Sequence, residues 1–353
     1  FAVHSSDIQS ATSESPVTLP IVGEIFAGSP IPDFPLTRNT AIKIMTGAPI
    51  PPGADAVVMV ENTIPEECQV KILSQVRPLE NIRKQGDEIK SGELLLSEGN
   101  RIGPAEIGLL ASQGISRIDA RFYPQVALMT SGDELVDPDS PIQAGQIRNA
   151  NSYTSAAELK TLDCPTVDFG IVRDDPSMIR QCIETALTQA QVLITCGGVS
   201  AGEKDYIPHI LKEMGVHIFF HRLNIKPGKP ILFGILDKKL IFGLPGNVVS
   251  VLSTFHLFVK PALRFLTGRK DWQNPVIFVR MARLIHNPGN RTFFVRCKLS
   301  PTPTGLPLAI PFEKQGSGML TSIQQADGFA VIPSDLKTVE EFDVLEFIPL
   351  KSD

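Results

Sequence analysis

The sequence predicts a multidomain α/β protein, in which a central domain with a parallel sheet lies between a small N-terminal β domain and a C-terminal β-barrel. Short strand-like runs separated by proline and glycine fill the first part of the chain, apolar strands alternate with helices in the middle, and helices stop after Arg269. The length of 353 residues suits two or three domains of roughly 100–200 residues. The predicted segments are residues 1–84, 85–122, 123–269 and 270–353.

The first two segments show different patterns. In the β domain, apolar runs at residues 21–25 and 56–60 predict strands, because Pro- and Gly-rich breakers lie between them. The connecting segment predicts one helix, since Pro104 stands at a first turn and Gly114 at an end.

Strands and helices alternate in the central domain. Predicted strands cover residues 125–130, 166–172, 192–195, 216–220 and 241–243, and predicted helices cover 151–162, 176–189 and 248–266. Apolar strands that alternate with helices are typical of a parallel sheet that is buried on both faces. In the last segment, the strand-like runs 276–284, 291–299, 328–332 and 343–348 predict the small β-barrel.

Charge and cysteine content exclude several classes of protein. The formal net charge is −5, from 33 Lys and Arg against 38 Asp and Glu, so we expect no nucleic-acid partner. No apolar run is expected to reach the roughly 18 residues that cross a membrane. Five cysteines without a C-x-x-C pair predict a reducing, cytoplasmic location. Because Phe1 stands in a strand-like run without an initiator Met, we expect the sequence to be a fragment.

Candidate functional residues lie in the loops after the strands, because ligands of open parallel sheets bind at the carboxyl ends of the strands. Groups that can cradle an oxyanion are Ser131, Gly197, Gly198 and Ser200. Cations suited to phosphate are Arg222, Lys226 and Lys229. Hard oxygen ligands suited to Mg²⁺ are Glu134, Asp174 and Asp205. The combination predicts a phosphorylated ligand or a nucleotide that is bound through a metal.

Structural explanations of the same residues stay open. The Gly-Gly pair after the third strand is equally typical of a tight turn, and either residue of the Asp174-Asp175 pair is equally typical of a helix cap. The lysines of residues 226–230 are also compatible with a solvated surface. Walker A, G-x-G-x-x-G and H-E-x-x-H motifs are absent from the sequence, which disfavours the enzymes that use them.

Several motifs together resemble a known family. They are TSGDEL from Thr130, GGVS from Gly197, KPGKP from Lys226, GLPGN from Gly243, MTGAP from Met45, GADAVV from Gly53, GSG from Gly316 and ADG from Ala326. These motifs resemble those of the molybdopterin molybdenumtransferases, the MoeA family, to which the E domain of gephyrin is related. The resemblance extends from one end of the chain to the other.

The resemblance implies a reaction and a set of site residues. The reaction is the insertion of molybdate into adenylylated molybdopterin, which releases AMP and molybdenum cofactor, with Mg²⁺ as cofactor. The implied catalytic residues are Asp205, Asp174, Glu134, Thr46 and Glu88, of which Glu134, Asp174 and Asp205 would also bind the metal. The implied substrate-binding residues are Ser131, Gly197, Gly198, Ser200, Arg222, Lys226, Lys229, Pro245 and Ser317.

The resemblance also implies partners and exposes departures. Members form homodimers, so residues 1–84 would face the partner's active site and residues 85–122 would belong to a dimerisation domain. Transient contacts with the molybdopterin adenylyltransferase and with apo-molybdoenzymes are implied as well. Glu88 stands where the family usually has Asp, Val248 stands where it usually has Pro, and the family's Asp-Gly would precede Phe1. Molybdopterin adenylylation and a non-catalytic scaffold of the gephyrin E type are the alternative functions.

Overall fold

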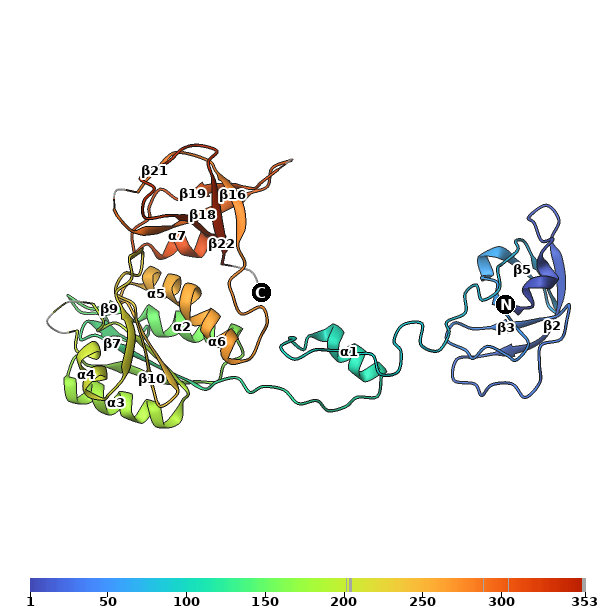
Figure 1. Cartoon of the computed structure of the whole chain (residues 1–353), viewed down its shortest axis with the longest axis horizontal. Coiled ribbons are helices and arrows are strands. Elements are labelled where there is room, and N and C mark those ends of the chain that lie inside the picture. Colours follow the sequence, from blue (N-terminus) through green and yellow to red (C-terminus); the bar gives the residue numbers. More distant parts are fainter. Residues whose placement is uncertain (201, 203–204, 288, 304, 351–353) are drawn as a thin grey trace. The chain divides into compact units, whose positions relative to one another are not determined.

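A computed structural model describes residues 1–200, 202, 205–287, 289–303 and 305–350 of the chain. The chain divides into two units, Phe1–Leu95 and Leu96–Asp353 (Figure 1). The division falls inside the predicted connecting segment, residues 85–122. Helix α1 (Pro104–Ser112) of the second unit begins at the proline that predicted it.

The N-terminal unit confirms the predicted β domain. It is a sheet with the strand order β4-β1-β3-β2-β6-β5. The strands are β1 (Ala2–Val3), β2 (Val17–Ile25), β3 (Ala41–Ile44), β4 (Ala56–Val57), β5 (Thr63–Pro65) and β6 (Gln69–Ile72), and the 3-10 turns are η1 (Ser5–Ile8) and η2 (Val60–Asn62). Apolar side chains of β2 and β6, among them Leu19, Val70 and Ile72, pack into one hydrophobic core.

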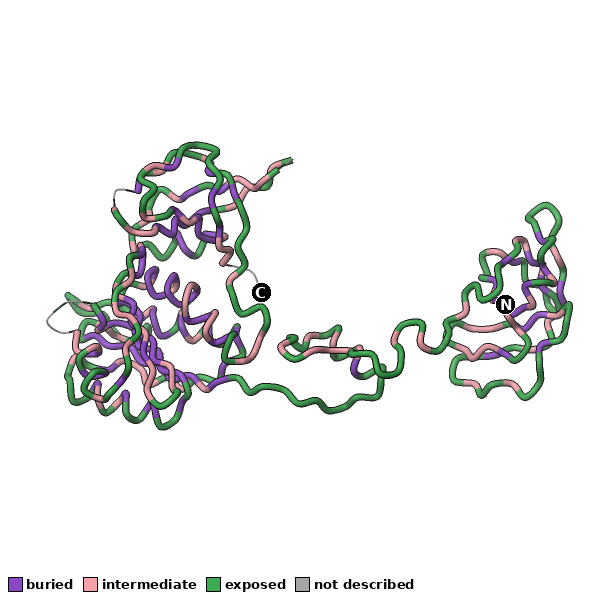
Figure 2. Tube along the Cα trace, in the orientation of Figure 1, coloured by how far each residue is buried: buried purple, intermediate pink, exposed green. Residues whose placement is uncertain are grey.

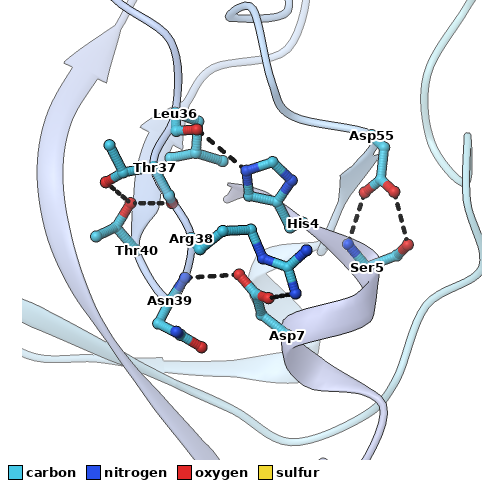
Figure 3. A network of polar contacts seen from close by, with 9 residues as sticks. All are labelled: His4, Ser5, Asp7, Leu36, Thr37, Arg38, Asn39, Thr40 and Asp55. Atoms are coloured by element: carbon cyan, nitrogen blue, oxygen red, sulfur yellow. Dashed lines mark hydrogen bonds and ion pairs between the residues drawn. The ribbon is translucent and has the colours of Figure 1, made fainter.

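Polar contacts join the start of the chain to two later loops of this unit (Figure 3). Asp55 accepts hydrogen bonds from the backbone nitrogen of Ser5 at 2.6 Å and from its hydroxyl at 2.8 Å. The buried side chain of Asp7 forms an ion pair with Arg38 at 2.5 Å and accepts a hydrogen bond from the backbone of Asn39 at 2.6 Å. The aspartate of the GADAVV motif therefore stabilises the β domain itself.

The central domain is built on a sheet with the strand order β10-β7-β11-β15-β14-β12. Its strands are β7 (Val126–Ser131), β10 (Thr166–Val172), β11 (Val192–Cys196), β12 (His217–His221), β14 (Leu232–Leu236) and β15 (Lys239–Leu244). Its helices are α2 (Ala150–Thr161), α3 (Pro176–Gln189), α4 (Ile207–Glu213), α5 (Val248–Thr254) and α6 (Lys260–Leu266), and a further small sheet pairs β8 (Leu135–Val136) with β9 (Ile147–Arg148). The alternation of strands and helices is confirmed.

Helices cover both faces of this sheet, because successive side chains of a strand point to opposite faces. In β7, Ala127 and Met129 pack against α3 and α4, whereas Val126 and Leu128 pack against α2, α5 and α6. Strands β7 and β11 are buried along their whole length, and Figure 2 shows buried segments in the middle of this domain. Strand β7 is therefore buried on both faces of the sheet.

The sheet is mixed, which corrects the expectation of a parallel one. Strands β10, β7, β11 and β15 run parallel, but β14 is antiparallel to β15, and β12 is antiparallel to β14. The β14–β15 hairpin turns at Asp237 and Lys238, which have φ values of 47° and 67°. Asp-Lys is not one of the usual sequence signals for such a turn. For this reason β14 was not predicted.

The predicted helix over residues 248–266 is continuous but changes its winding. The π-helical segment η3 (Phe255–Val259) lies between α5 and α6. Contrary to the expectation, this stretch is long and apolar enough to cross a membrane, with a mean hydropathy of 1.3 over its most apolar window. Two-thirds of that window, 67%, is buried inside the protein, as in the core helix of a globular domain.

The C-terminal segment forms the predicted barrel. Its strands are β16 (Ile277–Met281), β18 (Thr292–Ser300), β19 (Leu308–Pro311), β20 (Gly328–Ile332) and β22 (Val344–Pro349), accompanied by α7 (Leu320–Gln325), β17 (Ile285–His286) and β21 (Thr338–Val339). Because β18 pairs with both β19 and β20, the strands close on themselves. Strand β13 (Ile225–Lys226) pairs with β18 and joins the central domain to the barrel.

Candidate functional site

The carboxyl ends of β7 and β10 meet at Ser131 and Asp174. The buried hydroxyl of Ser131 donates a hydrogen bond to Asp174 Oδ1 at 2.5 Å. The backbone nitrogen of Asp133 approaches Asp174 Oδ2 at 3.4 Å, and the backbone nitrogen of Asp174 donates to Asp133 Oδ1 at 3.2 Å. The predicted pair Ser131 and Asp174 is therefore brought together, and Asp133 is a neighbour that the predicted site residues did not include.

The two adjacent aspartates have different roles. Asp175 is the N-cap of α3, and its Oδ1 accepts hydrogen bonds from the backbone nitrogens of Ser177 and Met178, both at 2.9 Å. A hydrogen bond from the Ser177 hydroxyl, together with that from the backbone of Met178, holds the pKa of the Asp175 carboxyl below its usual value. The helix-cap interpretation is thus right for Asp175, whereas Asp174 faces the end of the sheet.

Glycines let the loop after β11 approach the carboxyl end of β7, where Ser131 lies. Gly197 has a φ of +89°, and a Cβ there would lie 2.5 Å from the carbonyl oxygen of Ser131. At Gly198, a Cβ would lie 2.9 Å from Ile207. A Cβ on Gly246, in the loop after β15, would lie 3.9 Å from the Cα of Gly197. The Gly-Gly pair therefore forms a tight turn, and the backbone of this turn packs against the carboxyl ends of the neighbouring strands.

Gly197→Ala should therefore destabilise the protein by about 3 kcal/mol, since strain at positive φ and the clash with Ser131 add. Gly215→Ala is the matched control, because Gly215 has a φ of +83° and open space around its Cβ position. We expect the control to cost about 1 kcal/mol in urea unfolding, the strain alone. Equal losses in the two variants would mean that the backbone at Ser131 yields to the methyl group.

Glu134 and Asp205 lie in neighbouring loops. The carboxylate of Glu134 is exposed and folds over Gly132, with Oε2 2.7 Å from where a Cβ of that glycine would be. Asp205 Oδ2 accepts a hydrogen bond from the backbone of Gly202 at 2.6 Å, in a loop whose residues 201, 203 and 204 lie outside the described part. Within the residues that the structure describes, no three His, Cys, Asp or Glu side chains gather as a metal site. The predicted ligands are therefore not assembled into one cluster.

The remaining predicted residues of these loops differ in exposure. Arg222 is exposed, and its Nη2 donates to the carbonyl oxygen of Ser200 at 3.3 Å. Lys229 has an exposed side chain, as a solvated charge would have, and its carbonyl accepts a hydrogen bond from Leu223 at 2.8 Å. Pro245 is buried directly after β15.

A cation cluster, which consists of Lys226, Arg291 and Arg296, lies where β13 pairs with β18. The Nζ atom of Lys226 is 4.2 Å from the ring centroid of Phe293, and the side chain is half-buried. Burial lowers the pKa of Lys226, and the charges of Arg291 and Arg296 lower it further. Lys226 is therefore packed against Phe293 and half-buried, unlike the exposed Lys229.

Arg296 is fully buried in β18, and sequence reasoning missed it. Its Nη2 donates to the carbonyl oxygens of Gly316 at 3.1 Å and Lys314 at 3.4 Å, whereas Nε and Nη1 have no partner. Burial lowers the pKa of Arg296 to about 10. None of the carboxylates that the structure describes forms an ion pair with Arg296 or Lys226. A buried cation without a counter-ion is costly, so the arrangement around Arg296 favours an anionic ligand.

The strap, residues 314–319, connects this cluster to the central domain. Ser317 is half-buried, and its hydroxyl accepts a hydrogen bond from Asn247 Nδ2 at 3.1 Å. The carbonyl oxygen of Ser317 accepts a second one from the backbone of Val249 at 3.2 Å. The predicted residue Ser317 is thus held next to Gly316, whose carbonyl contacts Arg296.

Thr46 and Glu88 belong to the N-terminal unit. Thr46 is exposed in the turn after β3, where the backbone of Ala48 donates to the carbonyl oxygen of Met45 at 3.0 Å. Glu88 is exposed, and its Oε2 atom lies 3.7 Å from Arg83 Nη1. The roles that the resemblance implies for these two residues stay predictions.

The end of the sheet carries backbone N–H groups and carboxylates, and the strap joins it to the buried Arg296. These features define a class of protein that binds an anionic ligand. The family described as "MoeA N-terminal region (domain I and II)" matches residues 1–114, "Probable molybdopterin binding domain" matches 127–265, and "MoeA C-terminal region (domain IV)" matches 279–350. These three matches cover both units of the chain.

Relatives and solved structures agree with these matches. The chain is 37% identical to the molybdopterin molybdenumtransferase of Haemophilus influenzae over 80% of this chain and 69% of that protein. It is 36% identical to the molybdopterin molybdenumtransferase of Nostoc, over 94% of this chain and 77% of that protein. A crystal structure of the molybdopterin biosynthesis MoeA protein of Pyrococcus horikoshii superposes with a TM-score of 0.79 at 26% identity, over 99% of this chain and 85% of that one. The chain belongs to the molybdopterin molybdenumtransferase family.

Proposed function

We propose that this chain inserts molybdate into adenylylated molybdopterin and releases AMP and molybdenum cofactor. The observation that carries the proposal is the cation cluster, in which Arg296 is buried with two unpartnered nitrogens. Molybdate is a small oxyanion with two negative charges. Its oxygens would accept the N–H groups that Arg296 leaves unused, and its charge would relieve the repulsion between Arg296 and Lys226.

The organic substrate would bind at the carboxyl ends of the strands. Its phosphates are anions, and backbone N–H groups at glycine-rich turns such as Gly197-Gly198 are suited to them. Asp174 would receive its orientation from Ser131, whose hydroxyl is buried and directed at the carboxylate. Arg222 and Lys229 are exposed cations on loops of the same domain and would neutralise further phosphate charge.

We also propose Mg²⁺ as the cofactor. This ion is usually held by one or two carboxylates together with substrate phosphates, not by a cage of protein ligands. Glu134 is exposed, and Asp174 and Asp205 are half-exposed, so all three offer the oxygen donors that such an ion prefers and would hold it. When bound, Mg²⁺ would withdraw negative charge from the phosphate that leaves with AMP.

An assay of AMP release tests the proposal. The protein is incubated with adenylylated molybdopterin and Mg²⁺, with and without molybdate, and AMP is measured by chromatography. We expect AMP release to depend on molybdate and the KM for molybdate to rise with ionic strength, because anion and cations attract through charge. Tight binding of molybdopterin without any AMP release would contradict an enzyme and support the scaffold function.

The proposal includes a homodimer. Apolar side chains of the connecting segment are exposed, with Ile107 at 58%, Ile118 at 45% and Phe122 at 95% exposure. A second copy of the chain would cover them, since apolar surface is rarely left in water. Light scattering at the mass of a monomer would contradict this. Thr46 and Glu88 would then act in the site of the partner subunit.

We also propose a cytoplasmic location and two kinds of transient partner. All five cysteines are free, and burial raises the pKa of Cys196 and Cys297 to about 12. Unpaired thiols support a reducing, cytoplasmic location, which fractionation of cells would test. The molybdopterin adenylyltransferase and apo-molybdoenzymes are proposed as transient partners, which deliver the substrate and receive the cofactor; pull-down experiments that recover neither would contradict this.

A further inference from the structure

Asn247 begins helix α5 but does not cap it with its own side chain. An Asn at this position normally accepts a hydrogen bond from a backbone N–H of the first helical turn. Here the backbone N–H of Val249 donates to the carbonyl oxygen of Ser317, at 3.2 Å. The strap therefore takes over the capping contact, and the side chain of Asn247 makes a different one.

That contact is with the hydroxyl of Ser317. Asn247 Nδ2 donates to Ser317 Oγ at 3.1 Å. A hydroxyl has one hydrogen to donate and two lone pairs that accept. Because the amide occupies a lone pair, the hydrogen of Ser317 stays available, and none of the described residues accepts it. The carbonyl oxygen of the preceding residue, Gly316, accepts a hydrogen bond from Arg296, so the strap holds this hydroxyl one residue away from a contact of the cation cluster.

We propose that Asn247 is a positioning residue for molybdate, a role that rests on the proposed function. Its amide fixes the Ser317 hydroxyl with the hydrogen directed to an oxygen of the anion beside Arg296. Without the amide, the hydroxyl rotates freely and spends its hydrogen on water. An aspartate at this position accepts only, so it would reverse the hydrogen bond and add a negative charge that repels molybdate.

Two variants test this role through the KM for molybdate. Asn247→Ala should raise that KM about tenfold and leave kcat within about twofold, as expected when one hydrogen bond to an anion is lost. Asn247→Asp should raise it more, by about 100-fold, since charge repulsion is added. The matched control is Asn100→Asp, because Asn100 is exposed and accepts a hydrogen bond from Ser97 at 3.0 Å. The control should keep the KM of the parent.

A double-mutant cycle decides whether Asn247 acts through Ser317. In a Ser317→Ala background, Asn247→Ala should have no further effect on the KM. An equal tenfold effect in that background, or no effect of Asn247→Ala in the parent, would overturn the positioning role. The proposed function fails separately: if AMP release does not depend on molybdate in the parent, the site itself is assigned wrongly. Circular dichroism melting on each variant excludes misfolding as the cause.

Discussion

Replacing Arg296 by methionine should lower kcat/KM for molybdate by about 100-fold or more, the loss typical of one preorganised donor to a developing anion. The same variant should be at least as stable as the parent. Burying a guanidinium costs several kcal/mol, of which its two hydrogen bonds to strap carbonyls return about 1.5–3 kcal/mol each, and its Nε and Nη1 atoms have no partner. Methionine fills a similar volume without that desolvation cost. Activity and stability therefore move in opposite directions, which is the signature of a charge kept for a ligand.

AMP release and urea unfolding on the same preparation measure both quantities. Arg280→Met is the matched control, because Arg280 is exposed on strand β16 of the same barrel and donates to the carbonyl oxygen of Phe342 at 3.1 Å. We expect the control to keep its activity. If Arg296→Met unfolds the protein and the small residual fraction retains the parental KM, Arg296 is a structural arginine of the barrel.

The sequence predicts the sheet end better than it predicts the cation cluster. Chemistry at the sheet end depends on local patterns, in which a strand is followed at once by glycines or acidic residues, as at Gly197 and Asp174. Arg296 belongs to no such pattern. It stands between Val295 and Cys297 in a strand that also contains Lys298, and the strap brings the carbonyl oxygens that it contacts. A basic residue flanked on both sides by apolar residues of a strand is the signal that could have identified it.

Other differences between expectation and structure have equally local causes. The missed strand β14 is as apolar as its neighbours but returns through an Asp-Lys turn that lacks a recognisable signature. Lys226 resembles an exposed loop lysine in the sequence, yet pairing of β13 with β18 draws it against Phe293. Both outcomes depend on which strands pair with each other in the fold. The spacing of residues in the sequence does not show that pairing.

Asp174→Asn should reduce AMP release by about 100-fold while leaving the fold intact. The substitution replaces the carboxylate by a neutral amide, which binds a metal ion weakly and cannot accept a proton. Asp175→Asn is the matched control, because it makes the same chemical change at the adjacent residue. Asn is as good an N-cap as Asp, so this second variant should keep the hydrogen bonds to Ser177 and Met178 and its full activity.

The comparison separates two explanations that the sequence leaves equivalent. If both variants lose activity equally, the start of α3 matters as a whole, and the contact between Ser131 and Asp174 has no special role. If only Asp174→Asn is impaired, the carboxylate at the sheet end is the functional one. A Ser131→Ala variant then shows whether orientation matters: it removes the 2.5 Å hydrogen bond but keeps the charge, so it should cost less than the loss of the carboxylate.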